Sequence, residues 1–425
     1  MKPTIYKLEN CATGRQFEDT GWTLSDPEYN EPALIRAVYR KKQIEVRGHS
    51  WGLYRFADWM PVTGMLEGSC APITYKSEGL AAGLGLDNLY ITFSGWWPHR
   101  GAAMSTCSFK ETEAYSVCAR LPEVNDRTLV VASAGNTARA FAHVCSMNNI
   151  PIIIAIPLEN LSALWFREPL NPCVKIICTP TGTDYYDAIT LASKLNGSPR
   201  YLEEGGAKNI ARRDGMGTTL LSAAHFIGRI PDSYFQAVGS GTGAIAAYEA
   251  NLRLIGDGRF GNHLMKLFPS QNVPFTPMFD AYKAGSRTLL PFDDEQARVK
   301  ALEIKAKVLS NRRPPYSIAG GLFDALKATG GEMLVATNKD LDKACKLFEQ
   351  LEGIDIHPAA GVAVASLIQA ARGKKIRKEE TVMLNITGGG EKLYKSTHEW
   401  CGVNPNLIMD ASTPSQEVIE AVEKL

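Results

Sequence analysis

Two apolar patterns alternate along the middle of the chain. Runs of consecutive apolar residues predict buried strands, and apolar residues at helical spacing predict the helices between them. The predicted strands are residues 128–133, 150–156 and 174–178, and the predicted helices are residues 137–147, 160–166 and 184–195. Strands that alternate with helices of about ten residues indicate parallel βαβ units with right-handed crossovers.

The same alternation surrounds this region on both sides. An earlier apolar run predicts a strand at residues 89–93. Later strands are predicted at residues 233–238, 266–268, 333–337 and 381–386, and later helices at residues 244–254, 293–309, 340–351 (capped by Asn338) and 359–371. The chain is therefore predicted to be an α/β protein.

The length of 425 residues predicts two domains, because a single core stops growing well below that size. Residues 1–60 show no sustained period and are expected to form an N-terminal extension on the main body, with a short helix at residues 32–39. We expect a large domain from residues 61–114 and 226–425, and a small α/β domain from residues 115–225.

Charge and cysteine content argue against a nucleic-acid-binding, membrane-binding or disulfide-rich protein. There are 46 basic and 45 acidic residues, so no global field attracts nucleic acid or an anionic membrane, and any anion must be bound locally. Nine scattered cysteines without a Cys-x-x-Cys pair favour a reducing cytoplasm and argue against a disulfide framework or a metal site. The longest apolar run, residues 150–158, contains two prolines and is too short to span a bilayer. We expect a soluble, cytoplasmic protein.

Four segments that could bind a ligand or carry out chemistry follow predicted strands. A lone lysine is ordinarily a solvated surface residue, but Lys110 occurs together with three loops rich in glycine and hydroxyl residues. These loops are Ser133-Ala134-Gly135-Asn136-Thr137, Gly239-Ser240-Gly241-Thr242-Gly243 and Thr387-Gly388-Gly389-Gly390.

The second of these loops lies between a predicted strand and a predicted helix. Its backbone N–H groups and the helix N-terminus would suit a phosphate, although a tight turn is the simpler alternative. A dinucleotide site would need an acidic residue about twenty positions later, where the chain reads Asn262-His263-Leu264-Met265. The P-loop pattern also fails, because no Gly-Lys-Ser/Thr follows.

The other two loops also have two interpretations. The loop at residues 133–137 could bind a carboxylate at a helix N-terminus or could be only a capping turn. Thr387 could bind a ring nitrogen or could be a core threonine. Together the parts suit pyridoxal 5'-phosphate: Gly239 to Gly243 for the phosphate, Asn136 for the ring hydroxyl, Thr387 for the ring nitrogen and Lys110 for the aldehyde.

The order of these motifs resembles the fold-type II pyridoxal-phosphate enzymes, which are tryptophan synthase β-like, and within them threonine synthase. The resemblance covers roughly residues 60–400 and includes residues 209–218, which are similar to the Asn-Pro-Tyr-Arg-x-Glu-Gly-x-x-Thr stretch of that family. It implies two doubly wound parallel-sheet domains with the cofactor between them, a homo-oligomer, and Lys110 as both cofactor-binding residue and catalytic base.

The chain departs from threonine synthase near Lys110. Glu111-Thr112-Glu113 replaces the usual Asp-Arg-Gly, Cys107 replaces a glycine, and the N-terminal Cys-x-x-Cys ribbon is reduced to Cys11. The whole chain looks most like the cysteate synthases, paralogues of threonine synthase. That resemblance implies β-replacement on O-phospho-L-serine by sulfite, giving L-cysteate for coenzyme M.

The substrates of such an enzyme are anionic. We expect Ser133, Gly135 and Thr137 to bind substrate, with Arg139 as the cation for the phosphate of O-phosphoserine or for sulfite. Rival functions on the same fold are threonine synthase acting on O-phosphohomoserine, cysteine synthase and serine/threonine dehydratase. A non-catalytic ligand-binding module is the rival from another class.

Overall fold

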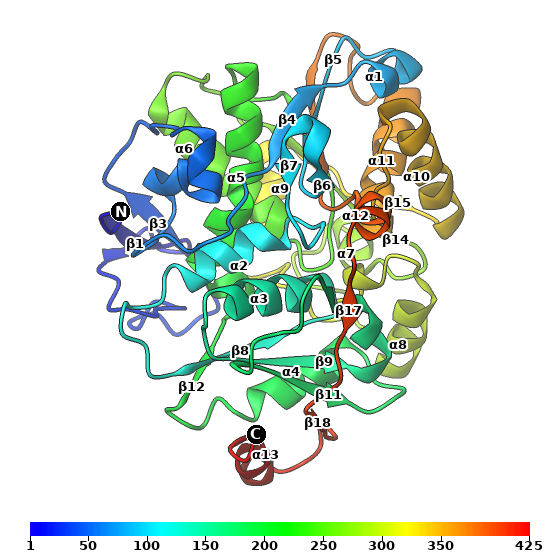
Figure 1. Ribbon diagram of the computed structural model, residues 1–425. Coiled ribbons are helices and arrows are strands. Elements are labelled where there is room, and N and C mark those ends of the chain that lie inside the picture. Colours follow the sequence, from blue (N-terminus) through cyan, green and yellow to red (C-terminus); the bar gives the residue numbers. More distant parts are fainter.

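The computed structural model describes residues 1–425 and contains two main β-sheets, one in the upper and one in the lower half of Figure 1. The larger sheet has six strands in the order β15-β14-β13-β16-β5-β4. All its neighbouring strands are parallel except β4, which is antiparallel to β5. In chain order the strands are β4 (Ile73–Lys76), β5 (Asn88–Phe93), β13 (Ser233–Ala237), β14 (Lys266–Asn272), β15 (Leu334–Ala336) and β16 (Thr381–Ile386).

The smaller sheet has five parallel strands in the order β12-β8-β9-β11-β18. Its strands are β8 (Thr128–Ala132), β9 (Ile152–Pro157), β11 (Val174–Thr179), β12 (Tyr201–Glu203) and β18 (Leu407–Ile408). Every residue of β9 and of β16 is buried. A strand covered on both faces has no polar side, which is why β9 is apolar throughout and β16 mostly apolar.

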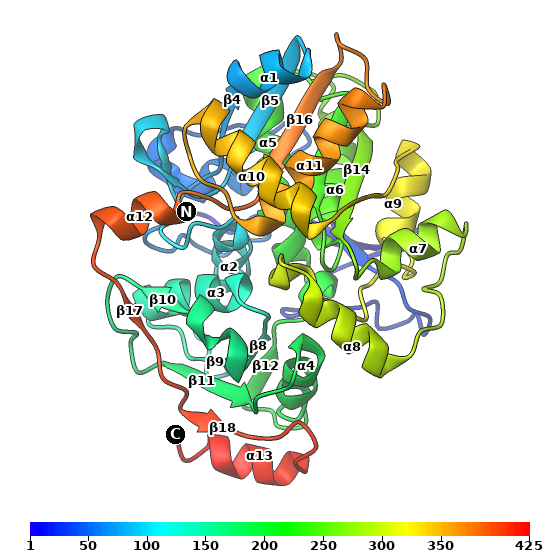
Figure 2. The ribbon, with the colours of Figure 1, turned by 90° about the vertical axis from the view of Figure 1, so that its right-hand side faces the viewer.

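Helices cover both faces of each sheet, as Figure 2 shows from the side. Helices α5 and α6 lie on one face of the larger sheet and α10 and α11 on the other; α3 lies on one face of the smaller sheet and α4 and α13 on the other. The helices are α1 (Gly79–Leu84), α2 (Lys110–Cys118), α3 (Asn136–Met147), α4 (Tyr185–Ser193), α5 (Ile210–Ile227), α6 (Thr242–Asp257), α7 (Pro277–Lys283), α8 (Asp294–Glu303), α9 (Leu322–Thr329), α10 (Asn338–Glu352), α11 (Pro358–Arg372), α12 (Glu391–Thr397) and α13 (Ser415–Val422). The predicted α/β class with doubly wound parallel sheets is confirmed.

The N-terminal segment forms a small sheet of its own. The helix predicted at residues 32–39 is wrong: β3 (Ile35–Tyr39) lies there and pairs antiparallel with β1 (Tyr6–Asn10), which also pairs with β2 (Gln16–Phe17). Buried and half-buried residues alternate along β3, the period of a strand with one covered face.

Other element boundaries also differ from the prediction. The segment at residues 160–166 forms a 3₁₀ helix (Leu158–Ala163) and strand β10 (Trp165–Phe166), because β10 pairs with the remote strand β17 (Cys401–Gly402). Helix α8 ends at Glu303, well before residue 309. The cap of α10 is Thr337, whose hydroxyl accepts a hydrogen bond from the Asp340 backbone in a capping box, and Asn338 is already helical.

The predicted division assigns all of residues 226–425 to the domain of the larger sheet. The C-terminal segment instead joins the smaller sheet. Strand β18 pairs in parallel with β11 of the smaller sheet, and Val418 and Val422 of α13 pack into the same apolar cluster. Figure 2 shows this segment running down one side of the molecule from α12 to α13. A two-residue edge strand carries too little periodicity to reveal its partner from sequence.

Helix α5 is almost completely buried and packs against both α2 and α6. Fifteen of its 18 residues are buried. A Cβ at Gly215 would lie 2.2 Å from the Thr112 carbonyl oxygen of α2, and a Cβ at Gly217 would lie 3.3 Å from the Ala246 carbonyl oxygen of α6. Glycine at both positions therefore lets the backbones of α2 and α6 approach α5 closely.

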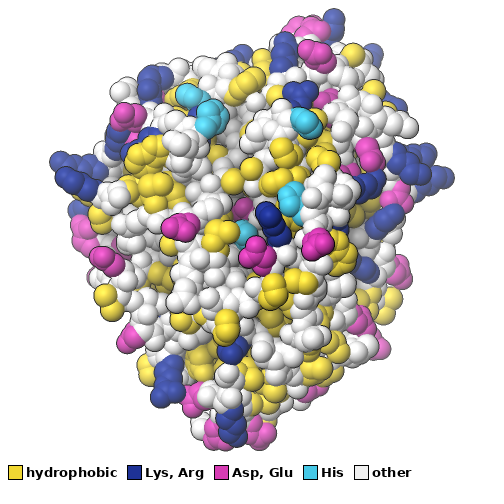
Figure 3. Space-filling view, viewed as in Figure 1, with side chains coloured by type: hydrophobic (Ala, Val, Ile, Leu, Met, Phe, Trp, Pro, Cys, Tyr) yellow, Lys and Arg dark blue, Asp and Glu magenta, His cyan; other side chains and the backbone are white.

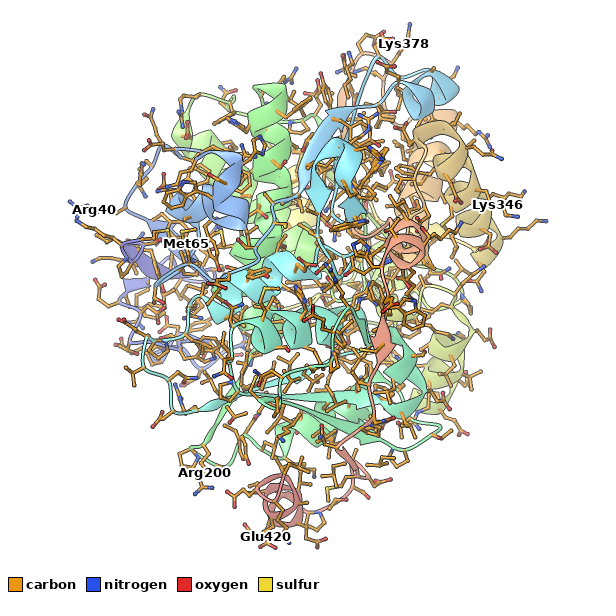
Figure 4. All side chains as sticks on the ribbon, in the orientation of Figure 1. Arg40, Met65, Arg200, Lys346, Lys378 and Glu420 are labelled. Atoms are coloured by element: carbon orange, nitrogen blue, oxygen red, sulfur yellow. The ribbon has the colours of Figure 1, made fainter.

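Charged residues of both signs are distributed over the face of the molecule that Figure 3 shows. Long side chains such as those of Arg200, Lys346 and Lys378 extend away from the body (Figure 4). None of the helices combines the length and the apolar character that a membrane crossing requires.

The close approach of α2 and α5 gives a first prediction. Gly215→Ala should lower the free energy of unfolding by about 1–3 kcal/mol, because the added methyl group meets backbone that cannot move aside cheaply. Gly256→Ala is the matched control, since no atom lies within 4 Å of the new Cβ and its φ is not positive; it should raise that free energy by about 0.5 kcal/mol. Urea denaturation curves measure both. A Gly215→Ala protein as stable as Gly256→Ala would contradict the close helix contact.

Candidate active site

The structure brings the lysine and the three loops together in one pocket. The loops follow the carboxyl ends of β8, β13 and β16, which is where open parallel sheets bind ligands. The predicted residues that line the pocket are Lys110, Ser133, Gly135, Asn136, Thr137, Gly239, Ser240, Gly241, Thr242, Gly243 and Thr387. Of the predicted site residues, Arg139 does not line it.

Lys110 is the first residue of α2, and its side chain is 19% exposed. Its Nζ atom lies 3.1 Å from Oε2 of Glu113, one helical turn further on. Burial lowers the pKa of Lys110, and the Glu113 carboxylate opposes that effect. An amine with a lowered pKa in a pocket is suited to nucleophilic and basic chemistry.

Glu113 connects Lys110 to two other parts of the pocket. It is fully buried and accepts a hydrogen bond of 2.9 Å from the Thr137 hydroxyl. Arg212 of α5 lies 3.4 Å from it and also pairs with Glu204 at 2.5 Å. Two carboxylates and two cations thus balance one another, as buried charges must.

The loop at Gly239 to Gly243 leads into α6. Gly241 has φ +82° and a Cβ there would lie 3.1 Å from Leu322, while a Cβ at Gly243 would lie 2.3 Å from the Gln236 amide nitrogen. The Ser240 and Thr242 hydroxyls lie 2.7 Å apart at the start of this sixteen-residue helix. Backbone N–H groups and two hydroxyls at a helix N-terminus suit a phosphate group.

The loop at residues 133–137 is partly a capping turn. The Ser133 hydroxyl accepts hydrogen bonds from the backbone of Gly135 at 3.0 Å and Ala138 at 2.9 Å. The Asn136 amide oxygen accepts a hydrogen bond of 3.2 Å from Arg139. The turn therefore orders the start of α3 while its residues still line the pocket.

Thr387 is 6% exposed and follows β16. Its carbonyl oxygen accepts a hydrogen bond of 3.0 Å from the Phe109 backbone, one residue before Lys110. Thr387 lines the pocket, and a threonine hydroxyl suits a ligand atom such as a ring nitrogen. This segment therefore holds the start of α2 beside the end of the central strand.

Arg139 lies behind the pocket wall and is 2% exposed. Its guanidinium donates to the carbonyl oxygens of Thr106 and Ala163 and stacks over Trp165, 4.4 Å from the ring centre. This position supports neither a substrate contact nor a solvated surface role. The sequence puts Arg139 two residues after Thr137 but does not show which side of α3 it occupies.

Sequence reasoning missed Glu113, which lies beside the pocket, and several residues that line it. Glu113 could have been found, since a residue three positions after Lys110 on a helix lies on the same face. His357, whose Nε2 lies 3.0 Å from Oε2 of Glu391, and Asn311 come from segments without a local signal.

The residues fit pyridoxal 5'-phosphate. The glycine loop leaves no room for a side chain at its three glycines and ends at a helix N-terminus. The pocket also holds an amine with a lowered pKa, and Asn136 and Thr387 add an amide and a hydroxyl. These are the groups that a phosphate, an aldehyde, a ring hydroxyl and a ring nitrogen require.

Comparisons with known proteins agree with this chemistry. Residues 97–388 match the family model described as pyridoxal-phosphate dependent enzyme. The chain is 46% identical to the cysteate synthase of Methanosarcina acetivorans, over 92% of this chain and 94% of that protein. It is 48% identical to the cysteate synthase of Methanosarcina mazei, with the same coverage, and 46% identical to that of Methanocella paludicola, over 92% of each chain.

Solved structures show the fold. Maize serine racemase matches with a TM-score of 0.58 and 14% identity, over 77% of this chain and 91% of that chain. A hydrogen sulfide-producing enzyme from Fusobacterium nucleatum matches with a TM-score of 0.53 and 14% identity, over 76% and 95%. By its sequence relatives and its family match, the chain belongs to the pyridoxal-phosphate dependent enzymes and, among them, to the cysteate synthases.

Proposed function

We propose that this protein catalyses β-replacement, converting O-phospho-L-serine and sulfite into L-cysteate and phosphate. The identity of 46–48% to curated cysteate synthases along more than nine-tenths of the chain carries the proposal. The pocket supports it, because an amine, a helix N-terminus, an amide and a hydroxyl meet there. In the reaction the bond from Cβ to the phosphate oxygen breaks and a bond from Cβ to sulfur forms.

Four parts of the pocket would hold pyridoxal 5'-phosphate. Lys110 would bind its aldehyde, residues 239–243 its phosphate, Asn136 its ring hydroxyl and Thr387 its ring nitrogen. When bound, the cofactor supplies an electron sink that makes the Cα proton of an attached amino acid acidic. A neutral hydroxyl at the ring nitrogen suits elimination from Cβ.

Lys110 also handles the proton. With a substrate in the pocket, Lys110 Nζ would take the proton from the substrate Cα and would later return it. Burial favours the neutral amine that accepts the proton, and Glu113 stabilises the ammonium that results. One lysine with one carboxylate partner therefore serves both transfers.

The N-terminus of α3 would bind the substrate carboxylate. Ser133, Gly135 and Thr137 lie at this positive helix end and line the same pocket as Lys110. Thr137 is already bonded to Glu113, so its hydroxyl can orient the site while the backbone N–H groups contact the carboxylate.

We also propose a cytoplasmic homo-oligomer that supplies L-cysteate for coenzyme M. None of the nine cysteines forms a disulfide, which accords with a reducing compartment. Members of the fold-type II group form homo-oligomers, which the resemblance extends to this chain.

Product analysis tests the function directly. The purified holoenzyme is given O-phosphoserine with sulfite, O-phosphoserine with sulfide, and O-phosphohomoserine alone. L-cysteate as the dominant product of the first mixture is expected. Cysteine formed faster from sulfide, or threonine formed from O-phosphohomoserine, would assign the enzyme to a rival reaction.

Lys110→Ala should abolish turnover and the near-violet absorption band of the bound cofactor while leaving the circular dichroism spectrum unchanged. The reason is that the amine is needed for chemistry and the side chain contributes little to the core. Lys392→Ala is the control, because Lys392 is exposed and pairs with Glu349. Activity retained in Lys110→Ala and lost in Lys392→Ala would place the essential lysine elsewhere.

Gly241→Val should weaken cofactor binding at least about tenfold, because a branched side chain disfavours the positive φ and obstructs the phosphate approach. Gly258→Val is matched for backbone strain, with φ +80° and no atom within 4 Å of the new Cβ. It lies at the other end of α6 and should lower stability without changing cofactor affinity. Titration of each apoenzyme with pyridoxal 5'-phosphate measures the affinities. Equal affinities of the Gly241→Val and Gly258→Val proteins would indicate that the loop is only a turn and does not bind the phosphate.

Glu113→Gln should lower the pKa of Lys110 in the apoenzyme further below its usual range. Glu113 opposes the effect of burial, so removing its charge leaves desolvation and the Arg212 charge less opposed, with Glu204 the remaining acid. The neutral amine then predominates from a lower pH. The measurement is the rate at which a lysine-selective acylating reagent labels Lys110 as a function of pH, located by mass spectrometry. A midpoint that stays put or rises would contradict the pairing with Glu113.

A further inference from the structure

Arg139 makes four hydrogen bonds just outside the pocket. Nε and Nη2 donate to the Thr106 carbonyl oxygen at 3.1 and 2.9 Å, and Nη1 donates to the Ala163 carbonyl oxygen at 2.7 Å. Nη2 also donates to Oδ1 of Asn136 at 3.2 Å. Arg139 therefore contacts a pocket residue without lining the pocket itself.

The contact decides how the Asn136 amide is turned. A guanidinium has only donors, so the atom of Asn136 that faces Arg139 must be the amide oxygen. The NH2 group then points away from Arg139, and no acceptor within the protein bonds to it. Because Asn136 lines the pocket, a hydrogen-bond donor is left for a ligand there.

The structure also shows why the arginine is held so firmly. Its side chain is 2% exposed, stacks on Trp165 and lies 3.9 Å from the carboxylate of Glu391. Glu391 in turn pairs with Lys395 at 2.7 Å and with His357 at 3.0 Å. A buried charge that is fixed on several sides costs desolvation and suits a residue whose geometry must not vary.

We propose that Arg139 is a positioning residue that turns Asn136 so that its NH2 group donates to the oxygen of the ring hydroxyl of pyridoxal 5'-phosphate, called the ring oxygen below. The inference rests on the proposed cofactor site, where the glycine loop takes the phosphate and Lys110 the aldehyde. The ring oxygen is the remaining anionic acceptor of the cofactor. Without Arg139 the amide could rotate and present its oxygen, which would repel that acceptor.

A cofactor analogue separates positioning from a merely structural role. The affinities of pyridoxal 5'-phosphate and of 3-deoxypyridoxal 5'-phosphate, which lacks the ring oxygen, are measured for the wild type, Arg139→Met, Asn136→Ala and the double variant. Arg139→Met should bind the natural cofactor about tenfold more weakly, as expected for a lost charge-assisted hydrogen bond. It should bind the analogue within about twofold of wild type. The losses in Arg139→Met and Asn136→Ala should not add in the double variant.

An equal loss of affinity for the cofactor and for its analogue in Arg139→Met would overturn the proposal. Arg139 would then only hold the Thr106 and Ala163 carbonyl groups in place. Arg213→Met is the control for removing a buried arginine, because Arg213 is fully buried and is not among the pocket residues. It should lower stability and affect the two cofactors alike.

Asn136→Asp keeps the proposal testable if Arg139→Met does not fold. A carboxylate still pairs with Arg139, but the donor to the pocket is gone. Its affinity for pyridoxal 5'-phosphate should fall at least about tenfold, and its affinity for the analogue should change much less. Unchanged affinity for the natural cofactor would overturn the proposal. No substrate is used in these measurements, so an error in the proposed reaction would not affect them, whereas a wild type that binds no cofactor would end the proposed function itself.

Discussion

The contact between the backbones of α2 and α5 at Gly215 sets the geometry on which the other parts depend. Helix α2 carries Lys110, and α5 also packs on α6, which begins at the glycine loop of residues 239–243. Arg212 and Arg213 extend from α5 to Glu113 and to the carbonyl oxygen of Ile35 in the N-terminal sheet. One helix with small residues at its contacts thereby fixes the distance between the amine of Lys110 and the glycine loop.

Electrostatics in this protein is local. A net charge of +1 attracts no anion from a distance, yet the pocket region concentrates Lys110, Arg212, Glu113 and Glu204, and Arg139 with Glu391 lies behind its wall. Each of these six charged groups has a partner of opposite sign within 4 Å, so a substrate with several negative charges would add unpaired charge to the pocket.

The sequence predicted the parts of the structure that local pattern controls. Buried strands such as β9 and β16, and the loops that follow β8, β13 and β16, were visible because an apolar run ends where a functional loop begins. The α/β class is confirmed by the sheets and by the family match. Features set by remote partners escaped: β10 pairs with β17, β18 pairs with β11, and Arg139 turns toward Thr106 and Ala163. No window of neighbouring residues contains those partners.

The order of strands in the larger sheet has a consequence for biosynthesis. Strands β4 and β5 join the rest of that sheet only through β16, which follows β5 by almost 300 residues of chain. At about 5–20 residues per second, a ribosome exposes the early pair for roughly 15–60 s before its neighbour emerges. During that interval the edge of β5 has unpaired backbone and apolar side chains in contact with solvent. Nascent chains of this protein should therefore depend on chaperones that bind exposed strands until translation is almost complete.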